Sequence, residues 1–137
     1  MREHAILTFS VSTRAARQFV DITESIQSAV ARNGVQDGVC YVFLPHTTAA
    51  LTLNENWDPD VAGDILHTLG RHTAPPDPEH RHAEGNSPAH VQSSLLGANL
   101  FVLVEKGRLI LGSWQGVFLA EFDGPRERRV MVKILGG

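Results

Sequence analysis

This sequence has little cysteine, little net charge and few long apolar runs. Each of these features excludes a class of protein. Cys40 is the only cysteine, so no disulfide can form within the chain, and we expect a cytoplasmic protein. The net charge of -3 at pH 7 gives no electrostatic basis for binding nucleic acid or an anionic membrane. The first apolar run is broken by Thr8 and Ser10, so we expect neither a signal peptide nor a membrane span.

The remaining composition is that of an ordinary globular domain. Of the 137 residues, 42% are hydrophobic and 20% are charged. These values exclude a disordered chain, and the length suffices to bury one core. We therefore expect a single domain over residues 1–137.

Strand patterns dominate both ends of the chain. In the first half, apolar alternation or a continuous apolar run predicts strands at 6–11, 17–22, 38–44 and 49–53. In the second half, apolar runs between turn residues predict strands at 99–105, 108–114, 116–122 and 128–135. The short turns favour an antiparallel meander in which each strand pairs with the next. Imperfect alternation in these strands indicates burial on both faces, which an oligomer interface would complete.

Helices are predicted nearer the middle. Three stretches carry start and end signals, namely 23–34, 58–70 and 87–97. In the second of these, Asp58 suits the N-cap, Pro59 suits the first helical position and Gly70 suits the end. A loop over 71–86 follows, and so long a loop in a compact domain is typically functional. The predicted class is α+β, with packed antiparallel β-sheets in a sandwich-like arrangement and two to three helices.

His46 is the first candidate for a functional side chain. It follows the apolar strand predicted at 38–44, where a rigid scaffold presents side chains to a cleft. Asn54, Glu55 and Asp58 add an amide and two carboxylates farther along the chain. Turn chemistry and a helix cap account for Asp58, whereas the polar neighbours of His46 favour a functional role.

A second candidate lies in the loop over 71–86 and the helix after it. His82 and His90 are eight positions apart, and a loop followed by a helix can bring two imidazoles onto one ion. Catalytic zinc prefers three protein ligands, so His46 would be the third. Any histidine-rich loop can show this spacing, so a metal site and an ordinary exposed loop remain alternatives at this stage.

Two carboxylates are candidates for a general base or for orienting a ligating imidazole. They are Glu84, within the loop, and Asp64, on the helix predicted over 58–70. The alternative is that both are solvated surface charges, and for Asp64 the position opposite the apolar stripe favours this.

Anion-binding candidates gather at turns. Asn86 precedes a helix N-terminus, where free N–H groups attract anions, and Arg126 follows a Gly-Pro turn. Arg128 and Arg129 are interpreted instead as charges that keep a sheet edge soluble. Trp114, at a turn between strands, suits either core anchoring or the stacking of a flat ring.

Three segments together resemble one known family. They are HTTAALTLNENWDPDVAGDIL, HAEGNSPAHVQSSLLG and GRLILGSWQGVFLAEFDGPRERRV, in this order. They closely resemble the YjbQ-like family, whose members are labelled secondary thiamine-phosphate synthases. The resemblance implies a compact α+β fold with packed antiparallel sheets that assembles as a homotrimer.

The resemblance also implies a set of site residues. His46, His82 and His90 would line a metal-binding cleft, and the metal would be divalent, with zinc favoured and magnesium possible beside a diphosphate. Around the cleft it implies Asn54, Glu55, Asp64, Glu84 and Asn86. For a phosphorylated small-molecule substrate it implies Arg108, Trp114, Gln115 and Arg126.

The implied activity joins a hydroxymethylpyrimidine diphosphate to a thiazole phosphate and releases pyrophosphate. The metal and Arg126 would stabilise the leaving charge, and Glu55, Asp64 and Glu84 are the candidate catalytic carboxylates. Diphosphates are normally bound through carboxylate-held magnesium, so a three-histidine zinc site suggests that the synthase is a side activity. The alternatives are a metal-assisted hydrolase and a non-enzymatic metal- or anion-binding module.

Overall fold

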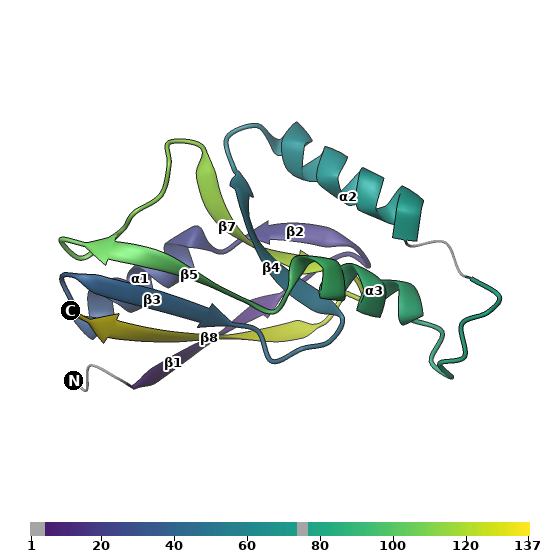
Figure 1. Cartoon of the computed structure of the whole chain (residues 1–137), viewed down its shortest axis with the longest axis horizontal. Helices are drawn as coiled ribbons and strands as arrows, with labels where there is room; N and C mark the ends of the chain where they lie inside the picture. Colours follow the sequence, from purple (N-terminus) through teal and green to yellow (C-terminus); the bar gives the residue numbers. More distant parts are fainter. Residues whose placement is uncertain (1–4, 74–76) are drawn as a thin grey trace.

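The computed structural model describes residues 5–73 and 77–137. Within these ranges the chain forms three helices and eight strands (Figure 1). In chain order they are β1 (Ile6–Ser12), β2 (Gln18–Asp21), α1 (Thr23–Asn33), β3 (Gly38–Phe43), β4 (Ala49–Glu55), α2 (Pro59–Thr73), α3 (Ser87–Leu96), β5 (Asn99–Glu105), β6 (Arg108–Leu109), β7 (Gln115–Glu121) and β8 (Glu127–Gly136).

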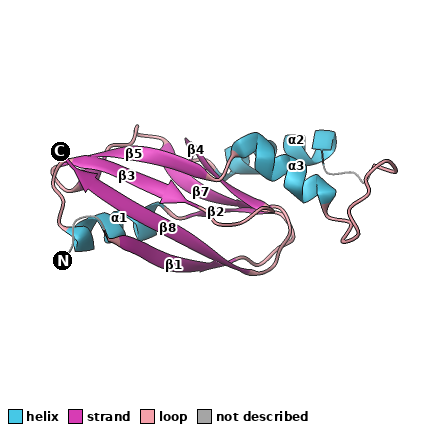
Figure 2. Ribbon diagram, turned by 60° about the horizontal axis from the view of Figure 1, so that its bottom comes forward, coloured by secondary structure: helices cyan, strands magenta, loops and turns pink. Residues whose placement is uncertain are grey.

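The strands form two antiparallel sheets. The larger has the order β1-β8-β3-β5-β6 and the smaller has the order β2-β7-β4. Figure 2 shows α1 at one end of the sheets and α2 with α3 at the other. The predicted α+β fold with packed antiparallel sheets is confirmed.

The core lies between the two sheets and α1. Val42 and Val132 of the larger sheet and Leu119 of the smaller one are almost fully buried there, together with Ile26 of α1. Cys40, within the apolar run of β3, is also buried, and burial raises the pKa of its thiol to about 12. The thiol is therefore protonated at neutral pH, and Cys40 packs as a small apolar side chain.

The predicted C-terminal meander is wrong. β5 pairs with the two-residue β6, but β7 is the central strand of the smaller sheet, and β8 returns to the larger sheet between β1 and β3. Six of the seven residues of β7 are buried, as expected for a strand covered on both faces, whereas β8 alternates. Turn residues indicate where the chain reverses, but burial decides which sheet each strand joins.

α2 differs from its prediction at the C-terminal end. It continues through Gly70 to Thr73. A Cβ atom on Gly70 would lie 2.9 Å from Nη1 of Arg17, so this glycine gives the arginine room to approach and does not stop the helix. Within the predicted loop over 71–86, residues 74–76 lie outside the described residues.

α3 ends at Gly97 as its sequence predicts, but its N-cap is Asn86, one residue before the predicted cap at Ser87. Pro88 lies in the first turn, and Gly97 follows at the C-terminal end with a φ of 98°. None of the helices in the described ranges combines the length and the apolar character needed to cross a membrane.

Candidate ligand-binding site

A cavity of about 220 Å³ opens where three segments far apart in the sequence meet. These segments are the β3–β4 connection, the loop that runs into α3, and the β7–β8 connection. All eight lining residues carry polar or charged side chains, and we call this cavity the histidine pocket. They are Thr47, Thr48, His82, Glu84, Asn86, His90, Asp123 and Arg126.

Local backbone contacts bring these segments to the histidine pocket. Beyond β3, the N–H of Leu44 donates to the carbonyl oxygen of Ala98 at 2.8 Å, which holds the chain in place before Thr47. Gly85, with a φ of 72°, closes a turn by donating its N–H to the carbonyl oxygen of His82 at 3.1 Å. α3 then begins, and its first turn carries His90.

Two imidazoles lie edge to face in the histidine pocket. The ring centroids of His82 and His90 are 5.3 Å apart and their planes are at 89°. Nε2 of His82 lies 4.0 Å from Oε1 of Glu84, whose side chain is largely exposed. This pair of imidazoles is therefore open to solvent on the side of Glu84.

Asn86 contributes a buried acceptor without a partner. Its Nδ2 donates to Oδ2 of Asp123 at 2.8 Å, but its Oδ1 is buried with no hydrogen bond in the described part of the chain. A buried amide oxygen without a partner costs about 1–3 kcal/mol, so it calls for a donor or a cation. The unmatched oxygen belongs to a residue of the same pocket as the two imidazoles.

Arg126 is held beside the histidine pocket by Asp123. Its Nε donates to the Asp123 carbonyl oxygen at 2.8 Å and its Nη2 donates to the carboxylate at 2.9 Å. The side chain is half exposed. The guanidinium is therefore pre-oriented at the pocket edge and keeps N–H groups for a further acceptor.

The structure does not bring His46 into the set with His82 and His90. Nε2 of His46 accepts a hydrogen bond from the N–H of Arg129 at 2.9 Å, although Thr47, the next residue, lines the pocket. Among residues 5–73 and 77–137, no three side chains of His, Cys, Asp or Glu are placed to hold one ion. Burial and the nearby Arg128 and Arg129 lower the pKa of His46, which favours the neutral acceptor that this contact needs.

The predicted carboxylates Glu55 and Asp64 lie elsewhere. Glu55 lines a separate cavity of about 390 Å³ beneath α2, and its Oε2 accepts a hydrogen bond from the N–H of Asp58 at 3.3 Å. Asp64 is exposed on α2, beside Val61. Of the three candidate catalytic carboxylates, the structure brings only Glu84 to the histidine pocket.

The remaining anion-binding candidates lie in turns and at strand ends. Asn54 accepts a hydrogen bond from the N–H of Glu55, and Gln115 accepts one from the N–H of Gly112, both at 2.8 Å. Arg108 is exposed on β6. Trp114 is 55% exposed and packs edge to face against Trp57 at 5.7 Å. None of these four lines the histidine pocket, whereas Asn86 and Arg126 do.

The sequence interpretation missed a buried ion pair under the histidine pocket. Arg128, interpreted as a solubilising charge at a sheet edge, is only 2% exposed and pairs with the fully buried Glu121. That interpretation is wrong because β8 is not an edge strand, and Arg128 points into the molecule. A carboxylate within the apolar run of β7 was the available signal, since a buried charge requires a partner.

The family comparison agrees with the fold. The model of the family described as UPF0047 protein YjbQ-like matches residues 7–137. The chain belongs to this YjbQ-like family. A UPF0047 protein of Methanocaldococcus jannaschii is 44% identical over 131 residues, which cover 96% of this chain and 94% of the relative. The UPF0047 protein YugU of Bacillus subtilis is 42% identical, covering 94% of this chain and 98% of the relative.

Solved structures of YjbQ-like proteins are similar to this chain over nearly its whole length. A crystal structure of an uncharacterised YjbQ/UPF0047 protein from Clostridium acetobutylicum has a TM-score of 0.91 and 48% identity, covering 94% of this chain and 99% of the other. A YjbQ-like protein from Sulfolobus solfataricus has a TM-score of 0.90 and 36% identity, with 97% of each chain covered.

These comparisons correct the functional prediction. The relatives are named only as UPF0047 proteins, and the Sulfolobus protein is described as a protein of unknown function. Neither thiamine-phosphate synthase activity nor metal dependence is supported by any of them. The assignment of a metal-dependent synthase is therefore wrong for this YjbQ-like chain, and its function has to be inferred from the histidine pocket itself.

Proposed function

We propose that the histidine pocket binds a divalent metal ion, with zinc favoured, together with a phosphorylated small molecule. The observation that carries this proposal is the unpartnered Oδ1 of Asn86 beside the His82–His90 pair. Imidazole nitrogens suit zinc, and the neutral amide oxygen would be a third, weaker donor. The three proposed donors come from residues 82–90 and line one pocket, so the proposed set does not need His46.

The phosphorylated ligand follows from the charges and donors around this set. Glu84 and Asp123 give two negative charges against one positive charge on Arg126, so neutral imidazoles leave the pocket with a net charge of -1. A divalent cation would reverse that sign to +1 and favour an anion. Arg126 and the hydroxyls of Thr47 and Thr48 would then donate hydrogen bonds to phosphate oxygens.

Zinc titration of untagged protein tests the metal site. We expect one zinc ion per chain, and we expect His90→Ala to weaken binding by more than tenfold because it removes a ligating nitrogen. His67→Ala, on the exposed side of α2, is the matched control and should bind zinc like the unchanged protein. Phosphate binding, measured calorimetrically with inorganic phosphate, should strengthen when zinc is present. Equal zinc binding by both variants would contradict the proposal.

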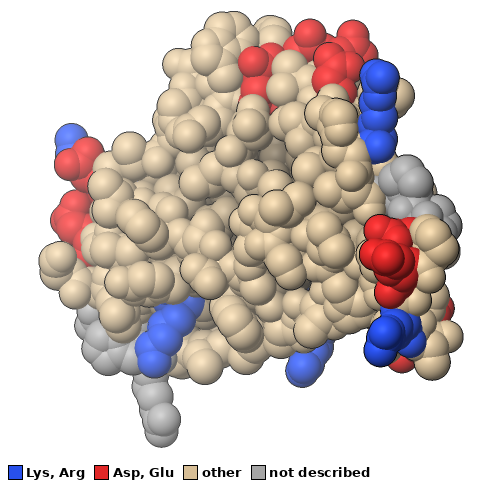
Figure 3. All heavy atoms as spheres, turned by 45° about the vertical axis from the view of Figure 1, so that its right-hand side comes forward, with Lys and Arg blue, Asp and Glu red and all other residues tan. Residues whose placement is uncertain are grey.

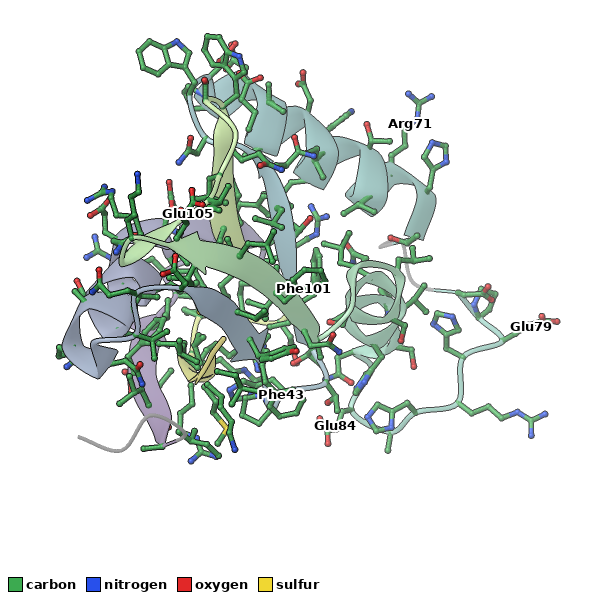
Figure 4. The ribbon with its side chains drawn as sticks, turned by 60° about the vertical axis from the view of Figure 1, so that its left-hand side comes forward. Phe43, Arg71, Glu79, Glu84, Phe101 and Glu105 are labelled. Carbon is green, nitrogen blue, oxygen red and sulfur yellow. The ribbon has the colours of Figure 1, made fainter. Side chains whose placement is uncertain are left out.

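We also propose that the chain forms a homotrimer through the outer face of its larger sheet. Five large apolar side chains on this face are about half exposed, namely Ile6, Tyr41, Phe43, Phe101 and Leu103. Phe101 pairs with Tyr41 across neighbouring strands, and Figure 4 shows Phe43 and Phe101 on this part of the molecule. Figure 3 shows a face of the molecule whose charged side chains lie mainly at its edges. Apolar patches of this kind mark protein interfaces.

Light scattering coupled to gel filtration tests the trimer. Phe101→Glu should give a monomer, because it places a charge in the centre of the apolar face. Leu95→Glu on α3, at a side chain that is 62% exposed, is the control and should leave the assembly unchanged. A monomeric unchanged protein would contradict the trimer but not the metal site.

A cytoplasmic location stays a prediction, which rests on the single cysteine.

A further inference from the structure

The Arg128–Glu121 ion pair is the most deeply buried charged group in the described part of the chain. Arg128 is 2% exposed and Glu121 is 0% exposed. Nε of Arg128 donates to Oε1 of Glu121 at 2.8 Å, and Nη2 donates to Oε2. A buried ion pair of this kind is often no more stabilising than apolar residues of the same size, so its presence calls for a role other than stability.

On one side, the pair holds the wall of the histidine pocket that follows β3. Nη2 of Arg128 donates to Oγ1 of Thr48 at 2.9 Å and to its carbonyl oxygen at 3.2 Å. Both acceptor atoms of this residue are therefore fixed by one guanidinium. Thr48 lines the pocket, so the position of this wall depends on Arg128.

On the other side, the pair holds the β7–β8 connection. Oε2 of Glu121 accepts the backbone N–H of Asp123 at 2.9 Å, and Oε1 accepts the hydroxyl of Thr13 at 2.9 Å. The Asp123 carboxylate then accepts hydrogen bonds from Asn86 at 2.8 Å and from Arg126 at 2.9 Å. The contacts thus run from the buried ion pair through Asp123 to two groups of the histidine pocket. These are the Asn86 amide, whose Oδ1 has no partner, and the Arg126 guanidinium.

We infer that Glu121 and Arg128 are positioning residues that set the geometry of the histidine pocket by holding two of its three segments, the β3–β4 connection and the β7–β8 connection. Neither side chain lines the histidine pocket, so both act through Thr48 and Asp123. The inference rests on the proposed function, because the pocket geometry matters only if the pocket binds a ligand. Partners that orient ligating groups typically change metal affinity by about 10- to 100-fold.

Glu121→Gln tests this role with almost no change in size. An amide has one acceptor oxygen in place of two, so it cannot accept all of the hydrogen bonds that Glu121 accepts. We expect zinc affinity, measured by competition with a chelating dye and corrected for the folded fraction, to fall by about 10- to 100-fold. Without metal, we expect the NMR signals of the Asn86 side-chain amide and the His90 ring to move. Arg128→Lys keeps the charge but not the forked geometry, and should give a smaller loss in the same direction.

The control is a variant that loses stability without touching the pocket. Ile134 is fully buried on β8, the strand that carries Arg128, and Ile134→Val or Ile134→Ala can be matched to Glu121→Gln by melting temperature. The matched control should keep its zinc affinity within about twofold and its Asn86 signals in place. If Glu121→Gln changes the zinc affinity and the Asn86 signals no more than the matched control does, the positioning role is overturned. If the unchanged protein binds no zinc, the proposed function fails, and the metal-free NMR comparison still decides the positioning role.

Discussion

Arg128→Met is expected to lower the free energy of unfolding by about 3–5 kcal/mol. The substitution removes the cation but leaves Glu121 fully buried, with only Thr13 and the N–H of Asp123 as hydrogen-bond donors. An uncompensated buried carboxylate is far more costly than the ion pair it came from. Urea unfolding followed by circular dichroism measures the change in the free energy of unfolding.

The double variant Arg128→Met with Glu121→Leu is the control for this prediction. It removes both charges and should recover a large part of the lost stability, since apolar residues can replace a buried pair at little cost. A double variant as unstable as Arg128→Met alone would show that shape, and not the unpaired charge, causes the loss.

The loss of stability expected for Arg128→Met depends on pH. Burial by itself would raise the pKa of Glu121, but hydrogen bonds from Arg128, the N–H of Asp123 and Thr13 lower it below its ordinary value. The stability gained from this lowered pKa is complete above the unfolded value of about 4.3 and is lost as the pH falls through the folded value. The difference in stability between the unchanged protein and Arg128→Met should therefore narrow in acid.

Gly38→Ala is the second change with a large expected effect. Gly38 begins β3 and pairs with Val104 on one side and with Gly136 on the other. A Cβ atom added here would lie 2.0 Å from the carbonyl oxygen of Leu135, which is backbone and cannot turn aside. β3 and β8 would have to separate, and we expect a loss of about 3 kcal/mol in the free energy of unfolding, measured in urea.

Gly63→Ala is the matched control for Gly38→Ala. Gly63 lies within α2, and nothing approaches within 4 Å of the place its Cβ would take. Alanine is favoured over glycine inside a helix by about 1 kcal/mol, so this variant should be more stable than the unchanged protein. If both variants lost stability to a similar degree, the close approach at Gly38 would not explain its effect.

Local sequence patterns predicted most elements of the fold but not their pairing. The alternation in β1 and the signals at both ends of α3 act within a few residues, so they can be read from the chain alone. The neighbours of β7 and β8 are chosen by burial between distant segments, and no turn residue encodes that choice. Gly70 shows the same limit. The side chain that occupies the space left by its missing Cβ belongs to Arg17, which is distant in the sequence.

In the candidate site, too, some residues could be predicted from the sequence and others could not. His82 and His90 were grouped from their positions in a loop leading to a helix, whereas Glu84 and Asn86 were placed with them by the family resemblance, and all four line the histidine pocket. The partner of His46 is a backbone N–H on β8, which a list of side chains does not reveal. Arg128 was misread because its burial depends on β8 lying between two other strands.

The direction of β1 and β8 has a practical consequence for experiments. β1 begins and β8 ends on the same side of the molecule, whereas α3 and the loop before it lie on the opposite side (Figure 1). A label, a fluorescent protein or a surface attachment fused to either terminus would therefore point away from the two imidazoles. Immobilised protein can be exposed to candidate ligands with its histidine pocket facing the solution.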